Sequence, residues 1–263
     1  MIYLEELHKD TMTTKLAADF LPQRVFTSDE VKARYGVSDH AAWQLVLYAK
    51  RRGQIGSVRK GLYFVVPPGD DPATYRPDPY LVAAKAAPAG VLAYHSALDL
   101  HGVAHSALHE VAVAVPTWRR PFPVGDIQIR FVVAPTGFGC QTLSREGVPI
   151  NVTDRERTLV DGCDRPHYSG GLEEFLRSVE GFPSVDHRRV LDYVRRYPRK
   201  SVTAKVGWVL DWFVEQWGFP DDVRRELQTL RPQGAVIFEP SPRKRLAGEW
   251  GVLVPRSLEA RLG

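Results

Sequence analysis

The spacing of hydrophobic residues over the first 70 positions predicts three short helices followed by a β-hairpin. Apolar residues recur at helical intervals over residues 13–20, again after Thr27, and again over residues 39–52. From residue 55 to residue 66 the pattern changes to one typical of two strands around a turn. The expected order of elements is therefore helix, helix, helix, hairpin.

Capping residues mark where the second and third helices begin and end. Thr27 is followed three residues later by Glu30, the spacing of a capping box. Gly36 accepts the left-handed conformation that ends many helices, and Ser38 can cap the next helix. Two helices joined by so short a turn and followed by a hairpin are the order of a winged helix-turn-helix. We therefore expect residues 1–69 to form a DNA-binding domain of this type.

The helix expected over residues 39–52 has one apolar and one polar face. The positions expected to pack inward are Ala42, Leu45, Val46 and Ala49. His40, Gln44 and Arg51 fall on the opposite face, where their side chains can reach base edges or phosphates in a major groove. This helix is therefore the predicted recognition helix.

The formal charges of this segment are of one sign. No acidic residue occurs between Asp39 and Asp70, whereas five lysines and arginines do. Three of them end the recognition helix and two lie in the wing, where they can neutralise the phosphates of a duplex. The predicted DNA-binding residues are Ser38, His40, Gln44, Lys50, Arg51, Arg52, Arg59 and Lys60. The pattern also leaves open a winged-helix adaptor that binds another protein through a solvated basic face.

The rest of the chain predicts a second domain of mixed α/β type with a helical end. Residues 68–79 are rich in proline, glycine and aspartate, which indicates a linker over residues 70–79 and a second domain over residues 80–263. Helices are expected at residues 80–87, 94–101, 172–179, 185–196 and 201–217, with another that Thr153 caps and that runs to Asp161. Strands are expected at residues 110–115, 127–133, 148–152 and 248–254. The predicted fold class of the whole chain is α+β.

Composition narrows the class of protein only slightly. The 263 residues carry a formal net charge of +4, and the pI of about 9.1 permits a polyanionic partner. The two cysteines, Cys140 and Cys163, are far apart, which excludes a disulfide framework and a four-cysteine zinc site. The sequence shows neither a signal peptide nor a membrane span. We therefore expect a cytoplasmic protein.

A metal site and an enzyme are the main competing hypotheses. His101, His105 and His109 recur every four residues, a spacing at which imidazoles can share zinc, but Gly102 is expected to end the helix between them. The acidic residues at positions 154–164 alternate with arginines, and an ion-paired helix face is their simplest role. No phosphate-binding loop or nucleophile elbow occurs. We therefore predict no catalytic residue, no metal and no cofactor, with a DNA-targeted nuclease as the rival from the enzyme class.

Basic residues also occur in clusters toward the end of the chain. They are Arg188-Arg189, Arg195-Arg196, Arg199-Lys200, Arg224-Arg225 and Arg243-Lys244-Arg245. Such clusters either extend a DNA footprint or belong to a solvated helix surface. The sequence leaves both interpretations open.

Three motifs, in this order, resemble the AbiEi-type antitoxins of type IV toxin–antitoxin systems. They are RKGLY at residues 59–63 in the predicted wing, YHSALDLHG at residues 94–102, and VTDRERTLVDG at residues 152–162. The resemblance extends from the N-terminal helices to about Val179, and the later helices match only in general character.

The resemblance implies a function for each predicted domain. The N-terminal winged helix would bind inverted repeats in duplex DNA upstream of its own operon and repress it. The C-terminal domain would carry the antitoxin activity and contribute to DNA binding. The functional partner would be a nucleotidyltransferase toxin of the AbiEii type, which such an antitoxin counters without a stable complex. The family brings no catalytic residue to transfer.

Overall fold

The computed structural model describes residues 15–107, 109–256 and 258. Over these residues the chain has a mixed α+β fold with three β-sheets. It divides into two compact units. Unit 1 contains the described residues up to Pro88 together with Phe122–Ile129 and Leu143–Ile150, and unit 2 contains the remainder. The expected division into residues 1–69 and 80–263 stays a prediction.

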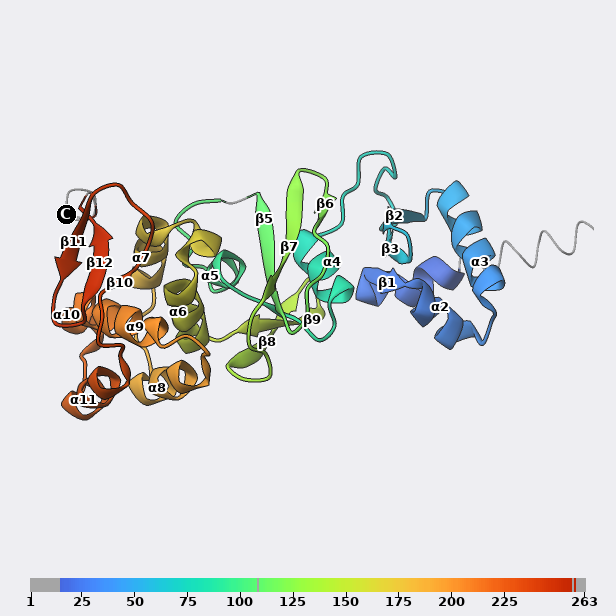
Figure 1. The fold of residues 1–263 in the computed structure, drawn as a ribbon. Helices are drawn as coiled ribbons and strands as arrows, with labels where there is room; N and C mark the ends of the chain where they lie inside the picture. Colours follow the sequence, from blue (N-terminus) through green and yellow to red (C-terminus); the bar gives the residue numbers. More distant parts are fainter. Residues whose placement is uncertain (1–14, 108, 257, 259–263) are drawn as a thin grey trace, which may run out of the picture. The chain divides into compact units, whose positions relative to one another are not determined.

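Unit 1 begins with short helical segments and a small antiparallel sheet (Figure 1). Residues 15–20 are helical, which covers the described part of the helix expected over residues 13–20. The elements that follow are η1 (Leu21–Gln23), β1 (Val25–Thr27), α2 (Ser28–Tyr35), α3 (Asp39–Arg51), β2 (Ile55–Arg59), β3 (Leu62–Val65) and α4 (Pro79–Ala86). The strand order is β1-β3-β2, with both pairings antiparallel. The predicted hairpin is confirmed, and β1 adds a third strand that the sequence pattern did not indicate.

The predicted caps of α2 and α3 are confirmed. The backbone N–H of Thr27 donates to Glu30 Oε2 at 2.8 Å, and the backbone N–H of Glu30 donates to Thr27 Oγ1 at 3.3 Å. Gly36 ends α2 with a φ of 63°, a conformation that favours glycine. Ser38 Oγ then accepts from the backbone N–H of Ala41 at 3.3 Å. The C-cap of α2 and the N-cap of α3 are thus only two residues apart, at Gly36 and Ser38, so the turn between the two helices is short.

The hydrophobic core of unit 1 joins these elements. Its fully buried members include Leu16, Phe20, Phe26, Val31, Val46, Ile55 and Val65. The rings of Phe20 and Phe26 stack with their centroids 4.4 Å apart. Ala42, Val46 and Ala49 face this core from α3, and Leu45 is partly buried against it. The predicted inward face of α3 is therefore confirmed.

The strands that follow α4 form two further sheets. Their elements are β4 (Val91–Leu92), β5 (Glu110–Val115), β6 (Phe122–Val124), β7 (Ile127–Val133), β8 (Cys140–Arg145), β9 (Val148–Thr153), β10 (Val236–Ile237), β11 (Lys244–Ala247) and β12 (Val252–Pro255). The first sheet has the order β6-β7-β5-β4-β9-β8. In the second, β12 pairs in parallel with β10 and antiparallel with β11. The strands expected at residues 110–115, 127–133 and 148–152 are confirmed.

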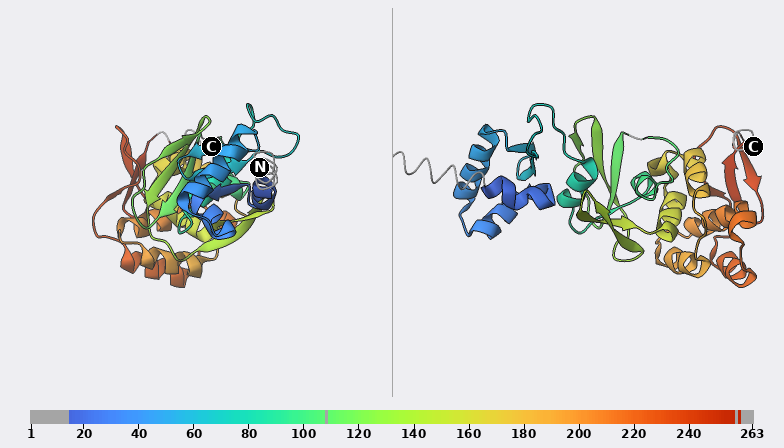
Figure 2. Two further views of the ribbon diagram at one scale, coloured as in Figure 1. Left: turned by 90° about the vertical axis from the view of Figure 1, so that its right-hand side faces the viewer. Right: turned by 180° about the vertical axis from the view of Figure 1, so that it is seen from behind.

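The helices of unit 2 pack around one large core. They are α5 (His95–Leu100), α6 (Arg155–Asp164), η2 (Pro166–Ser169), α7 (Leu172–Glu180), α8 (His187–Arg196), α9 (Ser201–Trp212), α10 (Val214–Trp217) and α11 (Asp221–Leu230). Helix α9 packs against α6 and α11, and against strands β10 and β12 (Figures 1 and 2). Residues 202–210 of α9 are buried throughout, so this helix is the centre of unit 2.

Three predicted elements of unit 2 need correction. Thr153 does not cap α6: Asp154 does, with its Oδ1 accepting from the backbone N–H of Arg157 at 2.8 Å. Thr153 is the last residue of β9. The single helix expected over residues 201–217 ends at Trp212, and α10 begins after Phe213. The strand expected at residues 248–254 begins only at Val252, because a turn occupies the preceding residues. Among the described residues, no helix is long and apolar enough to cross a membrane.

Candidate nucleic-acid interface

The solvent side of α3 carries polar and aromatic side chains. His40, Gln44 and Arg51 are exposed, as predicted for the face opposite the core. His40 Nε2 lies 3.0 Å from Gln44 Nε2, one helical turn away, and the Arg51 guanidinium lies 6.0 Å from the centre of the Tyr48 ring. These three side chains use no carboxylate partner from the described part of the chain. His40 and Gln44 therefore contact each other, and all three side chains are exposed to solvent.

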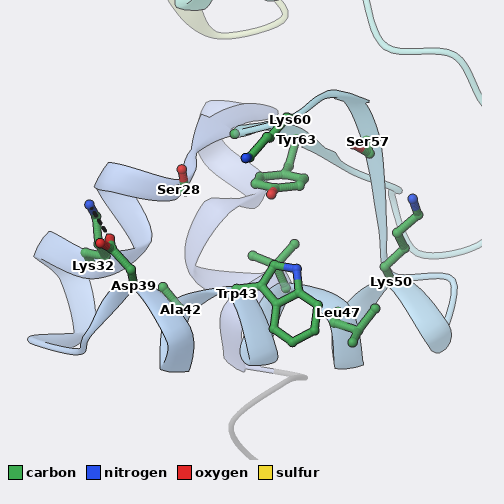
Figure 3. Close-up of a pocket in the computed structure, with 12 residues that line it drawn as sticks. Ser28, Lys32, Asp39, Ala42, Trp43, Leu47, Lys50, Ser57, Lys60 and Tyr63 are labelled. Carbon is green, nitrogen blue, oxygen red and sulfur yellow. Dashed lines mark ion pairs between the residues drawn. The ribbon is translucent and has the colours of Figure 1, made fainter.

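A groove lies between α3, the start of α2 and the β2–β3 hairpin (Figure 3). We call it the α3 groove. Its volume is about 710 Å³, and Trp43, Leu47 and Lys50 project into it from α3. Ser57, Lys60 and Tyr63 line it from the hairpin, and Ser28 and Lys32 from α2. The structure thus places a hairpin beside the helix that the sequence predicts to recognise bases.

The cations of the α3 groove differ in their partners. Lys32 is neutralised by Asp29 and Asp39, each with a carboxylate oxygen 2.7 Å from its ammonium nitrogen. Hydrogen bonds to these two carboxylates raise the pKa of Lys32 above its usual range. Lys50 and Lys60 form no ion pair with any carboxylate of the described residues. The groove therefore carries two positive charges that no carboxylate of residues 15–107, 109–256 or 258 neutralises.

The other predicted site residues lie outside the groove. Ser38 uses its hydroxyl to cap α3, and Arg52 occupies the C-cap position of the same helix. The Arg59 guanidinium lies 4.3 Å from the centre of the Phe122 ring, a cation–π contact within unit 1. The structure therefore brings Lys50 and Lys60 together in the groove and places His40, Gln44 and Arg51 along the adjoining face. Arg52 and Arg59 belong to neither group.

Sequence reasoning missed several residues that line the groove. Trp43 is 52% exposed, although an indole is one of the largest apolar side chains. Leu47 follows one turn later, and Tyr63 faces the same groove from the hairpin. One signal was available, because Trp43 and Leu47 are apolar positions outside the inward face of α3. The side of α3 that the hairpin lies beside depends on tertiary structure, so helical periodicity alone did not indicate it.

The three histidines considered for zinc lie in different surroundings. His101 donates from Nε2 to the backbone carbonyl oxygen of Thr153 at 2.8 Å, and burial lowers the pKa of its imidazole. The backbone N–H of His105 donates to Glu174 Oε1 at 3.1 Å, and His109 is exposed. Within residues 15–107, 109–256 and 258, no group of three His, Cys, Asp or Glu side chains is arranged to hold a metal ion.

The acidic and basic residues of α6 form ion pairs, as the sequence predicted, but the central pair is not at the surface. Arg157 and Asp161 are both buried, with Arg157 Nε 3.0 Å from Asp161 Oδ1. The guanidinium also donates to the carbonyl oxygens of Pro135 and Phe138, at 2.7 and 3.2 Å. This pair therefore belongs to the interior of unit 2.

Several of the basic clusters after residue 188 are neutralised within unit 2. Arg188 pairs with Asp222 at 2.6 Å, and Arg199 pairs with Asp164 at 3.2 Å. Arg195 pairs with Glu226, and Arg224 with Asp211. Such partners reduce the positive charge that these arginines present to a polyanion. The pairing favours the interpretation of a solvated, ion-paired surface over an extended DNA footprint.

Comparison with known proteins finds a structural likeness but no sequence match. No family model matches the chain, and no curated protein matches its sequence. The structure is similar to the crystal structure of the RV2827C protein from Mycobacterium tuberculosis, with a TM-score of 0.61 and 16% sequence identity. The match covers 96% of this chain and 94% of the other. The likeness therefore extends over almost the full length of both chains and concerns the mixed α+β fold.

Proposed function

We propose that residues 15–67 form a winged helix-turn-helix that binds duplex DNA, and that the protein is a sequence-specific transcriptional repressor. In this proposal α3 is the recognition helix and the β2–β3 hairpin is the wing. The observation that carries the proposal is the α3 groove, where Lys50 and Lys60 lie between helix and hairpin without a carboxylate partner among the described residues. A duplex phosphate backbone would supply anions for these two lysines.

The two sets of side chains would have different tasks. Lys50 and Lys60 would contact phosphates, which gives affinity and orientation but no sequence information. His40, Gln44 and Arg51 would face base edges, where arginine reads guanine and glutamine reads adenine. The exposed indole of Trp43 would add apolar contact with sugars or with a thymine methyl group. The length of α3, 13 residues, suffices to span a major groove.

A gel-shift titration on the DNA upstream of the gene tests this proposal. We expect a shift that survives scrambled competitor DNA and weakens as salt increases from low to physiological concentration. Lys60→Gln should weaken binding to all DNA and reduce the salt slope by about 0.9, because one phosphate contact is lost. Arg51→Ala should instead relax sequence preference, at a cost of about 1–3 kcal/mol on the preferred site.

Lys15→Gln is the matched control, because Lys15 is an exposed lysine of unit 1 that does not line the groove. It should bind like the wild type. If wild-type protein shifts no DNA at low salt, or if Lys60→Gln and Lys15→Gln behave alike, the proposal is wrong. A salt-independent response would favour a protein-binding adaptor. Nicked plasmid in the presence of magnesium would favour a nuclease.

We further propose that the repressor is the antitoxin of a type IV toxin–antitoxin system and regulates its own operon. This part rests on the resemblance of residues 59–63, 94–102 and 152–162 to AbiEi-type antitoxins. Its test is growth of cells that express a neighbouring nucleotidyltransferase gene with and without this chain. Rescue of growth without co-purification of the two proteins would support the proposal. Failure to rescue would refute the antitoxin role and leave DNA binding unaffected.

A further inference from the structure

Unit 2 contains a hollow that the proposed function does not use. Its volume is about 790 Å³, within the range of small-molecule sites. It lies between η2, the start of α9 and the segment around β10. Its lining includes Arg165, Tyr168, Arg199, Lys205, Phe238 and Glu239. We call it the unit 2 hollow.

Lys205 is the unusual residue of this hollow. It lies in the buried stretch of α9, and only 7% of its surface is exposed. Its ammonium nitrogen lies 5.2 Å from the centre of the Phe238 ring, and it forms no ion pair with a described carboxylate. Burial lowers the pKa of this amine. A buried ammonium group without a counter-ion is costly, so a protein rarely keeps one without a reason.

The carboxylates beside the hollow have other partners. Asp164 lies 3.2 Å from both Arg199 Nη1 and Arg165 Nε. Glu239 accepts from the backbone N–H of Leu172, at 3.2 and 3.3 Å, at the start of α7. Arg165 Nε is buried and lacks the geometry of a hydrogen bond. The charged lining therefore consists of three cations and two carboxylates, and Lys205 is the cation that forms no ion pair with either carboxylate.

Apolar and aromatic groups form the remaining wall. The rings of His167 and Tyr168 lie with their centroids 4.0 Å apart, and Phe238 faces the same hollow. Pro166, Pro240 and Ile237 complete this part of the lining. A wall of this kind suits a flat apolar body rather than a bare inorganic ion.

We propose that the unit 2 hollow binds a small organic anion. Its carboxylate or phosphate group would lie against Lys205 and Arg165, and its apolar or aromatic body against Tyr168 and Phe238. This site is independent of DNA binding by unit 1.

Calorimetric titration of the full chain tests the site with defined probes. Phenyl phosphate and benzoate carry the two candidate anions on one ring, and benzyl alcohol carries the ring without charge. We expect one or both anions to bind and benzyl alcohol not to bind. Lys205→Met should lower the affinity at least about tenfold, equivalent to about 1.4 kcal/mol. Lys200→Met, which removes an exposed lysine just before α9, should leave the affinity unchanged.

A second measurement separates binding from folding. Without ligand, Lys205→Met should keep or raise the Tm, because the substitution removes an unpaired buried charge and keeps a long side chain. A large decrease in Tm would show that Lys205 supports the fold instead and would overturn the proposal. Absence of binding of both anions to wild-type protein up to about 10 mM would overturn it as well. Equal binding of benzyl alcohol, or undiminished binding to Lys205→Met, would have the same consequence.

Discussion

Arg157 illustrates how a residue that looks exposed in the sequence is used inside the fold. It lies in a run of alternating acidic and basic residues, yet only 1% of its surface is exposed. Its guanidinium contacts Asp161, the Tyr197 hydroxyl and two backbone carbonyl oxygens. Burial raises the pKa of the Asp161 carboxyl, against the opposing effect of the arginine. Because both groups are buried, removal of either partner would leave the other as an uncompensated charge in the interior.

Removing one member of this pair should be far worse than removing both. Arg157→Met leaves the Asp161 carboxylate buried without its cation, and we expect a loss of about 3–5 kcal/mol in the free energy of unfolding. The double variant Arg157→Met, Asp161→Leu should recover much of that loss. Urea unfolding measures the free energy of unfolding of the single and the double variant. Arg177→Met, which breaks a half-buried pair with Glu173 near the surface, serves as control and should cost less than about 1 kcal/mol. Equal losses for Arg157→Met and Arg177→Met would contradict the assignment.

His101 predicts a pH dependence of stability. Burial lowers the pKa of its imidazole below the ordinary value of 6.5, so the unfolded chain takes up a proton at a higher pH than the folded one. The contribution of the neutral His101 imidazole to the free energy of unfolding is therefore complete above about pH 6.5 and is lost as the pH decreases below that value. His101→Gln should reduce the decrease in unfolding free energy between pH 7 and pH 5. The exposed His109→Gln should leave it unchanged, and a matching change in both variants would exclude His101 as the cause.

At the scale of elements, the sequence predicted those whose signals are local. The caps of α2 and α3 and the strands β5 and β7 follow from residues adjacent in the chain. Strand β8 was missed because most of its residues are exposed, which removes the alternation that marks a half-buried strand. Strands β1 and β10 contain three and two residues, too few for any period. Helix α11 was also missed, with only Val223 and Leu227 buried.

Gly207 of α9 should resist a substitution that usually stabilises helices. Gly→Ala within a helix normally gains about 1 kcal/mol. A Cβ at Gly207 would lie 2.3 Å from the ring of Trp250, which is only 1% exposed and packed on all sides. We therefore expect Gly207→Ala to decrease the unfolding free energy by about 1–3 kcal/mol. Thermal unfolding checks this against Gly234→Ala, whose Cβ would meet nothing within 4 Å. A neutral Gly207→Ala would show that the ring adapts.

At the scale of the whole molecule, the sequence predicted the α+β class but gave no sign of how distant segments combine. Unit 1 includes residues 122–129 and 143–150, which no local pattern connects to the first helices. The same limit applies to the α3 groove. Lys50 and Lys60 were predicted from the one-signed run of charges, whereas Trp43 and Tyr63 lie together only because helix and hairpin pack side by side. Predicting such contacts requires tertiary information.

A fragment ending at Pro88 should fold less completely than unit 1 in the full chain. It lacks Arg145, whose Nε lies 2.8 Å from Asp78 Oδ2, and Asp78 caps α4. It also lacks Phe122, the ring that contacts Arg59. We expect the amide protons of α4 to exchange at least about tenfold faster in the fragment, and those of α3 to change less. Equal protection of α4 in fragment and full chain would show that the later segments add nothing.

The three-part composition of unit 1 also imposes an order on its assembly during translation. When residue 88 has left the ribosome, α2, α3 and the hairpin have all their core partners, because these lie within residues 16–65. Three contacts of unit 1 can form only later in synthesis. They join Arg59 to Phe122, Asp78 to Arg145, and Arg24 to Glu146. At about 5–20 residues per second, that delay lasts several seconds. The nascent chain therefore carries a formed groove before the support for α4 has been synthesised.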